Sequence, residues 1–231
     1  MKIKSFLAVS MIALGAISFS FNGVAADKNT NSKMDTNTPQ PSVEEMHKIS
    51  EDDIVMGDSN APVTIIEYAS MTCSHCADFH KNVYPEIKKN YIDTGKVKLV
   101  LRAFPLDRVA LQASKMATCA GKDRFYKFTD VLFTTQSNWA FSKNHLEVLS
   151  NIGKLGGLDG AEFDKCLADT DLETRIMQGK LNAARVLGVR ATPSFFINGH
   201  KYKGAYKVKA FSEILDSVLS GKPQVSVEAA E

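Results

Sequence analysis

The sequence predicts an α/β protein in which a block of helices is inserted between two parts of one sheet. Strand-like runs occur near residues 63–68 and 97–101, and again near residues 194–197 and 200–202. Between these two groups, residues 107–187 carry helical signals throughout. The simplest arrangement joins both groups of strands in a single sheet and leaves the helical block as an insertion.

The part before the insertion is predicted to be a βαβ unit. Residues 63–68 are mostly β-branched and residues 97–101 are a second apolar run, and both suit buried strands. Apolar residues recur at helical spacing from Phe79 to Ile87 between them, and Pro85 should kink that helix. Strand, helix and strand in this order make the two strands parallel neighbours.

The insertion contains signals for the ends of several helices. Glycines close two of them, at Gly121 and at the pair Gly156-Gly157. Two more helices should open with capping boxes, formed by Asp159 with Glu162 and by Thr170 with Glu173.

The part after the insertion should be a hairpin followed by a helix. Asn198-Gly199 favours a type I′ turn between the two strands. Apolar residues at helical spacing over residues 208–219 then predict a final amphipathic helix.

The beginning of the chain resembles a secretory signal peptide over residues 1–26. Lys2 and Lys4 precede an uncharged apolar run, and Val24-Ala25-Ala26 is a typical cleavage site. The alternative is a membrane anchor, but the run is shorter than the ~20 residues that a spanning helix needs. The sequence therefore predicts export to the periplasm, where disulfides can persist.

The remaining chain divides into a polar tail, a folded domain and a second tail. Residues 27–54 should be a flexible tail with a short helix over residues 42–50, residues 55–221 the domain, and residues 222–231 a C-terminal tail. The chain is 44% hydrophobic and its net charge is +2, which the two leader lysines account for. This balance gives no reason to expect a nucleic-acid partner.

Two of the four cysteines form a Cys-x-x-Cys motif at the start of a predicted helix. The free N–H groups and partial positive charge there should lower the pKa of Cys73, and a protonated His75 would act in the same direction. Cys76 lies one turn further in and can resolve a mixed disulfide at Cys73. The alternatives are an inert disulfide and a structural zinc site, which would need a second such motif or a close histidine pair.

With these motifs the chain resembles the DsbA family of thioredoxin-fold thiol–disulfide oxidoreductases over residues 55–221. The resemblance is carried by residues 65–68, by Cys73-Ser74-His75-Cys76, and by residues 189–199, which contain Thr192-Pro193. It implies a thioredoxin-like fold with an inserted helical domain at about residues 107–187. It also implies a cis Thr192–Pro193 bond against the cysteine motif and a loop that offers its backbone to an extended substrate.

Glu67 interrupts an apolar strand six residues before Cys73. A carboxylate that faces a sheet interior is costly to bury. In the DsbA family a buried acid at the matching position is thought to relay a proton to or from the second cysteine; the alternative is that Glu67 points to solvent. His80 departs from the family pattern, since some relatives have an acidic residue there. It could tune Cys76, but we expect it to cap the surface.

The other two cysteines, Cys119 and Cys166, lie in separate predicted helices of the insertion. A disulfide between them would stabilise the fold by about 4 kcal/mol. Two buried free thiols or a second redox pair are the alternatives. The large aromatic residues of the insertion, Trp139 together with Phe125, Phe128 and Phe133, are expected in its core.

The predicted function is a periplasmic enzyme that introduces disulfides into exported proteins through Cys73 and Cys76. The resemblance suggests that a DsbB-like membrane quinone reductase reoxidises it. We expect a monomer without cofactor or metal. A disulfide isomerase or reductase is the first alternative, although only a polar tail stands where dimeric isomerases carry a dimerisation domain. A metal-binding or surface module is the second, although copper proteins on this fold usually space their cysteines further apart.

Overall fold

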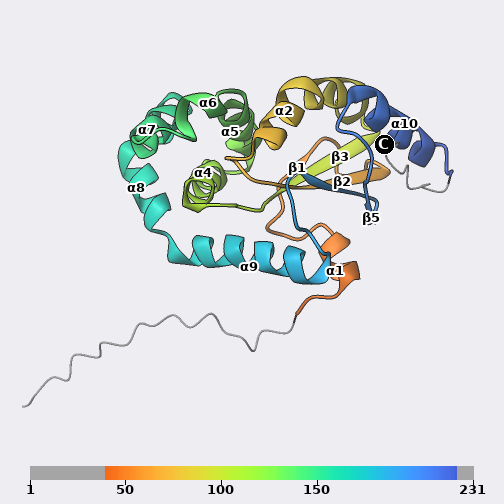
Figure 1. Ribbon diagram of the computed structural model, residues 1–231, viewed down its shortest axis with the longest axis horizontal. Helices are drawn as coiled ribbons and strands as arrows, with labels where there is room; N and C mark the ends of the chain where they lie inside the picture. The colour runs from red at the N-terminus through yellow and green to blue at the C-terminus, as the bar shows by residue number, and fades with distance from the viewer. Residues whose placement is uncertain (1–39, 223–231) are drawn as a thin grey trace, which may run out of the picture. The chain divides into compact units, whose positions relative to one another are not determined.

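The computed structural model of the chain describes residues 40–222 (Figure 1). The predicted signal peptide, residues 27–39 of the polar tail and residues 223–231 lie outside this range. Five strands form one sheet in the order β1-β3-β2-β4-β5. The strands are β1 (Val55–Met56), β2 (Val63–Ala69), β3 (Val97–Ala103), β4 (Ser194–Ile197) and β5 (His200–Lys201).

The pairing of the strands confirms the predicted βαβ unit and hairpin. β2 and β3 are parallel, with Glu67 opposite Leu101. β4 pairs antiparallel with β2, which joins the two parts of the sequence in one sheet. β5 returns beside β4 after Asn198 and Gly199, which both have positive φ as a type I′ turn requires. β1 adds an antiparallel edge to β3.

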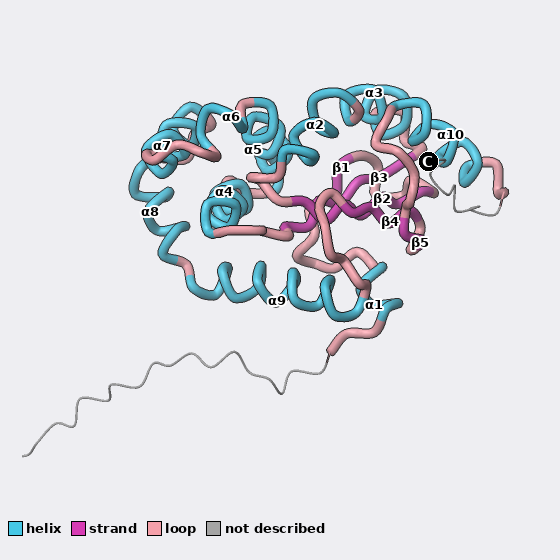
Figure 2. The backbone as a smooth tube through the Cα atoms, in the orientation of Figure 1, coloured by secondary structure: helices cyan, strands magenta, loops and turns pink. Residues whose placement is uncertain are grey.

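Helices cover both faces of the sheet and form a separate block at one end of it (Figure 2). The helices are α1 (Val43–His47), α2 (Ser74–Asn82), α3 (Tyr84–Ile87), a π-helical turn η1 (Lys88–Ile92), α4 (Arg108–Cys119), α5 (Lys122–Thr134), α6 (Gln136–Trp139), α7 (His145–Leu155), α8 (Gly160–Ala168), α9 (Thr170–Val186) and α10 (Val208–Leu219). Within residues 40–222, none has both the length and the apolar character needed to cross a bilayer.

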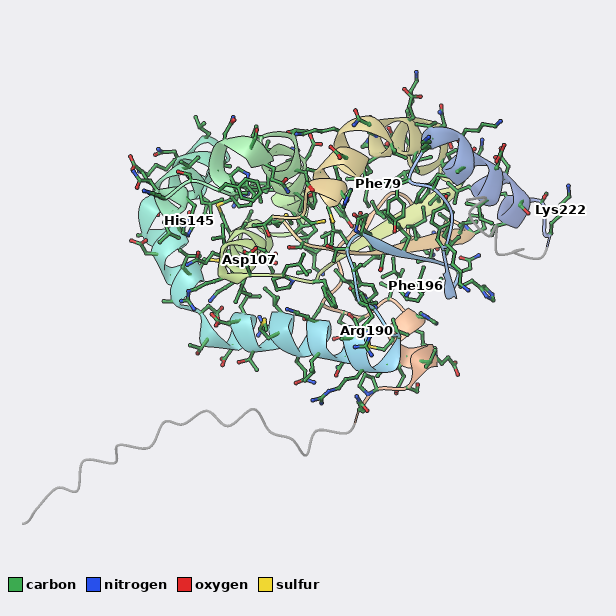
Figure 3. The ribbon with its side chains drawn as sticks, in the orientation of Figure 1. Phe79, Asp107, His145, Arg190, Phe196 and Lys222 are labelled. Atoms are coloured by element: carbon green, nitrogen blue, oxygen red, sulfur yellow. A yellow bond between two sulfur atoms is a disulfide. The ribbon has the colours of Figure 1, made fainter. Side chains whose placement is uncertain are left out.

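The alternation of side chains along β2 decides which helix each residue meets. Val63 and Ile65 pack with Phe79 of α2, on the face that α2, α3 and α10 cover. Ile66 and Tyr68 pack with Phe196 on the opposite face, beside α9. Figure 3 shows Phe79 and Phe196 on the two sides of the sheet. Because alternate residues of a strand share a face, Glu67 faces α2.

The insertion has a core of its own, which includes the aromatic residues expected there. Trp139 and Phe133 have no exposed surface, and Phe125 and Phe128 are also buried. The indole N–H of Trp139 donates to the carbonyl of Leu132 at 2.9 Å, so its polar atom is satisfied. This core continues to Ala69, Met71 and Cys76 at the end of the sheet.

Local sequence signals explain several helix ends, and two of the predictions need correction. Asp159 and Glu162 form the predicted capping box at α8. Thr170 does not cap α9, because Asp169 is the N-cap and its carboxylate accepts from the Leu172 N–H. Pro85 does not merely kink a helix: α2 ends at Asn82 and α3 begins at Tyr84, with the proline in its first turn.

The N-terminal segment, residues 40–54, is packed against the domain, which corrects the expectation of a tail that is flexible up to residue 54. α1 is shorter than the predicted helix and begins with a capping box between Ser42 and Glu45. The Arg102 guanidinium of β3 donates to the carbonyls of Met46 and Lys48 and forms an ion pair with Asp53 at 2.7 Å. A polar segment is thus ordered because one half-buried arginine finds its acceptors there.

Replacing this arginine should therefore release the N-terminal segment. Arg102→Ala is expected to cost about 2 kcal/mol of unfolding free energy, because several charge-assisted hydrogen bonds are lost together. Hydrogen exchange at the amides of residues 43–54 should accelerate. Lys98→Ala is the matched control, since Lys98 lies on the same strand but donates to Ser59 instead. Equal exchange rates in the two variants would mean that Arg102 does not hold the N-terminal segment in place.

Candidate active site

The two motif cysteines occupy different environments at the start of α2. Cys73 is the N-cap residue, with extended backbone, and Cys76 lies in the first turn. Both are free thiols; Cys73 is partly exposed, whereas Cys76 is fully buried. The side chains of Ser74 and His75 between them are exposed. Only Cys73 is therefore accessible to another protein's sulfur atom.

The pKa of Cys73 is lowered to about 5. The largest cause is the hydrogen bond from the Cys76 thiol. Thr192 and the backbone N–H groups of Cys76 and His75 add to it, while partial burial opposes it. These donors stabilise the thiolate at the helix N-terminus, as the sequence predicted. Residue 75 contributes through its backbone N–H.

The pKa of Cys76 is raised well above its usual range. Burial is the main cause, and the hydrogen bond that its thiol donates to Cys73 and the negative charge of Glu67 add to it. Near neutral pH the reduced site therefore holds a thiolate at Cys73 and a thiol at Cys76.

The loop before β4 lies against the nucleophile. The Thr192–Pro193 bond is cis. The Cys73 sulfur atom lies 3.2 Å from the Thr192 carbonyl oxygen, to which the thiol form donates a hydrogen bond. The structure thus brings Cys73 together with residues 119 positions away in sequence.

Two residues that the sequence did not single out hold the loops of this site. The Gln136 amide of α6 donates to the carbonyls of Met71 and Cys73 at 2.8 and 2.9 Å. The Tyr206 hydroxyl donates to the Pro193 carbonyl at 2.8 Å. No local sequence pattern marks either residue, because each reaches the site through tertiary packing alone.

Glu67 and His80 form a buried pair beside the cysteines. Glu67 has no exposed surface, so the alternative in which it points to solvent is wrong. His80 is 2% exposed, which corrects the expectation that it caps the surface. Its Nε2 lies 3.0 and 3.2 Å from the two carboxylate oxygens of Glu67. The ring is buried because it stacks on Phe133 of α5.

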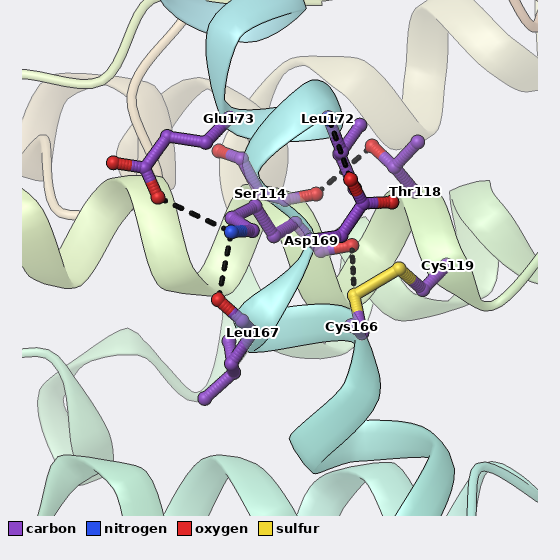
Figure 4. Close-up of a disulfide and its surroundings, with 9 residues drawn as sticks. Ser114, Thr118, Cys119, Cys166, Leu167, Asp169, Leu172 and Glu173 are labelled. Atoms are coloured by element: carbon purple, nitrogen blue, oxygen red, sulfur yellow. Dashed lines mark hydrogen bonds and ion pairs between the residues drawn. A yellow bond between two sulfur atoms is a disulfide. The ribbon is translucent and has the colours of Figure 1, made fainter. Parts of the chain in front are cut away.

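The other two cysteines are joined by a disulfide, Cys119–Cys166, which links the end of α4 to α8 (Figure 4). The buried Lys115 ammonium lies nearby and donates to the Leu167 carbonyl and to Glu173, at 2.8 and 3.2 Å. The disulfide and Lys115 both join α4 to α8, and Lys115 also reaches α9. Of the His, Cys, Asp and Glu side chains that the structure describes, no three are placed to hold a metal ion.

The reduced site should titrate at low pH. Absorbance of the thiolate near 240 nm should follow a pKa of about 5, and Cys73→Ser should abolish this transition. Because the folded pKa lies below the unfolded one, the thiolate stabilises the reduced fold fully above the unfolded pKa. This contribution declines as the pH falls and is lost below about pH 5. A transition near the ordinary pKa of a thiol would mean that these hydrogen bonds do not stabilise the Cys73 thiolate.

An accessible thiolate, a buried second thiol and an adjacent cis-proline loop on this sheet define a thioredoxin-fold thiol–disulfide oxidoreductase. A thioredoxin family model matches residues 49–217. A Rickettsia felis protein named "Putative protein-disulfide oxidoreductase" is 35% identical over 83% of this chain and 72% of its own length. The chain matches less of four other rickettsial relatives, between 62% and 66% of their length.

Solved structures point to the same family. The crystal structure of Wolbachia pipientis alpha-DsbA1 is 34% identical, with a TM-score of 0.73 over 78% of this chain and 97% of that one. Bacillus subtilis BdbD shares the fold, with a TM-score of 0.63 at 22% identity over 80% of this chain and 98% of that one. The chain belongs to the DsbA family of thioredoxin-fold thiol–disulfide oxidoreductases.

Proposed function

We propose that the chain is a disulfide donor, which oxidises pairs of cysteines in other proteins. The observation that carries the proposal is the difference between the two thiols, a stabilised thiolate at Cys73 beside a buried thiol at Cys76. Stabilising a thiolate in the reduced state makes the corresponding disulfide more oxidising. The oxidised chain should then pass its disulfide on readily.

The exchange proceeds in two steps at Cys73. A substrate thiolate attacks the Cys73 sulfur atom, the bond to Cys76 breaks, and Cys76 receives its electron pair. A second substrate thiolate then attacks the first substrate sulfur, and Cys73 leaves as the thiolate that the helix start stabilises. The substrate gains a disulfide and the chain ends with two reduced cysteines.

The substrates that we propose are exported proteins that have not yet folded. The access to Cys73 beside the cis-proline loop suits an extended chain, which could pair with the loop backbone. The signal-peptide pattern of residues 1–26 supports a periplasmic location. In this proposal a DsbB-like membrane protein reoxidises the chain, which acts as a monomer.

Oxidative refolding tests the direction of exchange. The oxidised chain should introduce disulfides into a reduced, unfolded protein in the absence of glutathione, and Cys73→Ala should not. A chain that leaves the reduced protein unchanged but rearranges a scrambled one would be an isomerase. That result would overturn the proposal.

A further inference from the structure

His80 is a buried ionisable side chain that the exchange at Cys73 does not require directly. Its ring stacks on Phe133, with ring centres 4.2 Å apart, and its ring centre is 4.9 Å from that of Tyr84. Burying a polar ring among aromatic residues is costly unless a partner compensates it. The carboxylate of Glu67 supplies that partner.

His80 also lies close to the resolving cysteine. It follows Cys76 by four residues in α2, so the two side chains lie on the same face of the helix. Glu67 lies on the strand face that α2 covers. We call Cys76, Glu67 and His80 the Cys76 cluster; all three side chains are at least 98% buried.

The hydrogen bond between His80 and Glu67 is compatible with two proton counts. The Nε2 of an imidazolium and that of a neutral imidazole can both donate to a carboxylate. Nδ1 is buried and has no hydrogen-bond partner among the described residues. The ring can therefore carry one proton or two with its Nε2 beside Glu67, and Nε2 is the atom through which a proton can pass to the carboxylate.

We propose that His80 is a positioning residue that, through Glu67, stores the proton exchanged by Cys76. This inference rests on the proposed function. When a substrate thiolate attacks Cys73, the disulfide breaks and its electron pair passes to Cys76. The His80 imidazolium then passes its Nε2 proton to Glu67, and Glu67 passes a proton to the buried Cys76 thiolate, which leaves the ring neutral with its proton on Nδ1. When the chain is reoxidised, the Cys76 thiol returns that proton to the pair as its sulfur atom forms the new bond.

Other titratable groups face the Cys76 cluster from the elements around it. Cys73 lies on the same helix, Tyr84 on α3, Tyr126 and Asp130 on α5, and Tyr206 before α10. Burial raises the pKa of all three tyrosines, so they stay neutral between pH 5 and 8. Asp130 is exposed to solvent.

Single-turnover oxidation of a dithiol peptide by the oxidised full-length chain tests the role of His80. Gln can donate a hydrogen bond to Glu67 but cannot take up a proton, so His80→Gln isolates the proton store. We expect its rate at about pH 6 to fall about tenfold, with a flatter pH profile than that of the wild type. His145→Gln is the control, since His145 contacts Gln112 in the insertion, and it should match the wild type. Superimposable wild-type and His80→Gln profiles would overturn the inference.

A second measurement needs no variant. Nitrogen NMR of the wild-type imidazole should show that the proton occupancy of His80 at a fixed pH differs between the oxidised and reduced chains, because linkage is reciprocal. Equal occupancy in both states would overturn the inference even if His80→Gln does not fold. A wild-type chain that cannot oxidise the peptide would overturn the proposed function. The NMR comparison of the oxidised and reduced chains would still decide the role of His80.

Discussion

Cys76→Ala should convert the chain into a trap for its partners. Its Cys73 stays accessible and keeps the backbone N–H donors of the helix start, although it loses the hydrogen bond from Cys76. It can still attack a disulfide-bonded peptide, but no second thiol stands beside the mixed disulfide to release it. We expect a stable covalent adduct, visible by mass spectrometry without reductant, while the wild type releases the peptide. The expected loss in the rate of release is at least a hundredfold, since the intramolecular resolving thiol is gone.

Cys73→Ala is the matched control for this experiment. It keeps one motif cysteine, but that cysteine is fully buried and its thiol is protonated near neutral pH. It should form no adduct in the same time. Equal trapping by both variants would show that the roles of the two cysteines are not those that burial and charge indicate.

Removing the Cys119–Cys166 disulfide should cause the largest loss of stability. The bond joins residues 47 positions apart, so the double variant Cys119→Ala/Cys166→Ala should lose about 4 kcal/mol of unfolding free energy in the chain-entropy model. Urea unfolding of both proteins with the Cys73–Cys76 pair kept reduced measures the difference.

Lys115→Met provides a comparison at the same place. It removes a buried ammonium that bridges Leu167 and Glu173 but leaves the disulfide intact. Lys115→Met should lose less unfolding free energy than the double cysteine variant, since the disulfide still restricts the conformations of the unfolded chain. A double cysteine variant as stable as the wild type would mean that the disulfide does not stabilise the insertion.

The sequence predicted the parts of the site that depend on local structure. The Cys-x-x-Cys motif follows a strand and opens a helix, which is sufficient to place Cys73 at a helix N-terminus. The position of Glu67 within an apolar strand allowed it to be suspected as buried. The spacing of four between Cys76 and His80 was an available signal for a shared helix face. It could not show that Phe133 covers that face, since Phe133 arrives from the insertion.

Long-range packing supplied what the sequence could not. Gln136 holds the carbonyl of Cys73 from 63 residues away, and only the folded insertion brings it there. The polar composition of the N-terminal segment predicts a tail. In the structure, Arg102 of the sheet holds the segment by donating to the Lys48 carbonyl and to Asp53. Its capping box, Ser42 with Glu45, was the local sign of order.

The reduction potential of the Cys73–Cys76 pair decides whether the chain gives its disulfide away or keeps it. Equilibration of the full chain in glutathione buffers, followed by alkylation and mass analysis, measures it. A disulfide donor with a stabilised Cys73 thiolate should have a potential more positive than about −200 mV. A value near about −270 mV, which is typical of thioredoxin, would mean that the chain holds its disulfide firmly and would contradict the proposed direction of exchange.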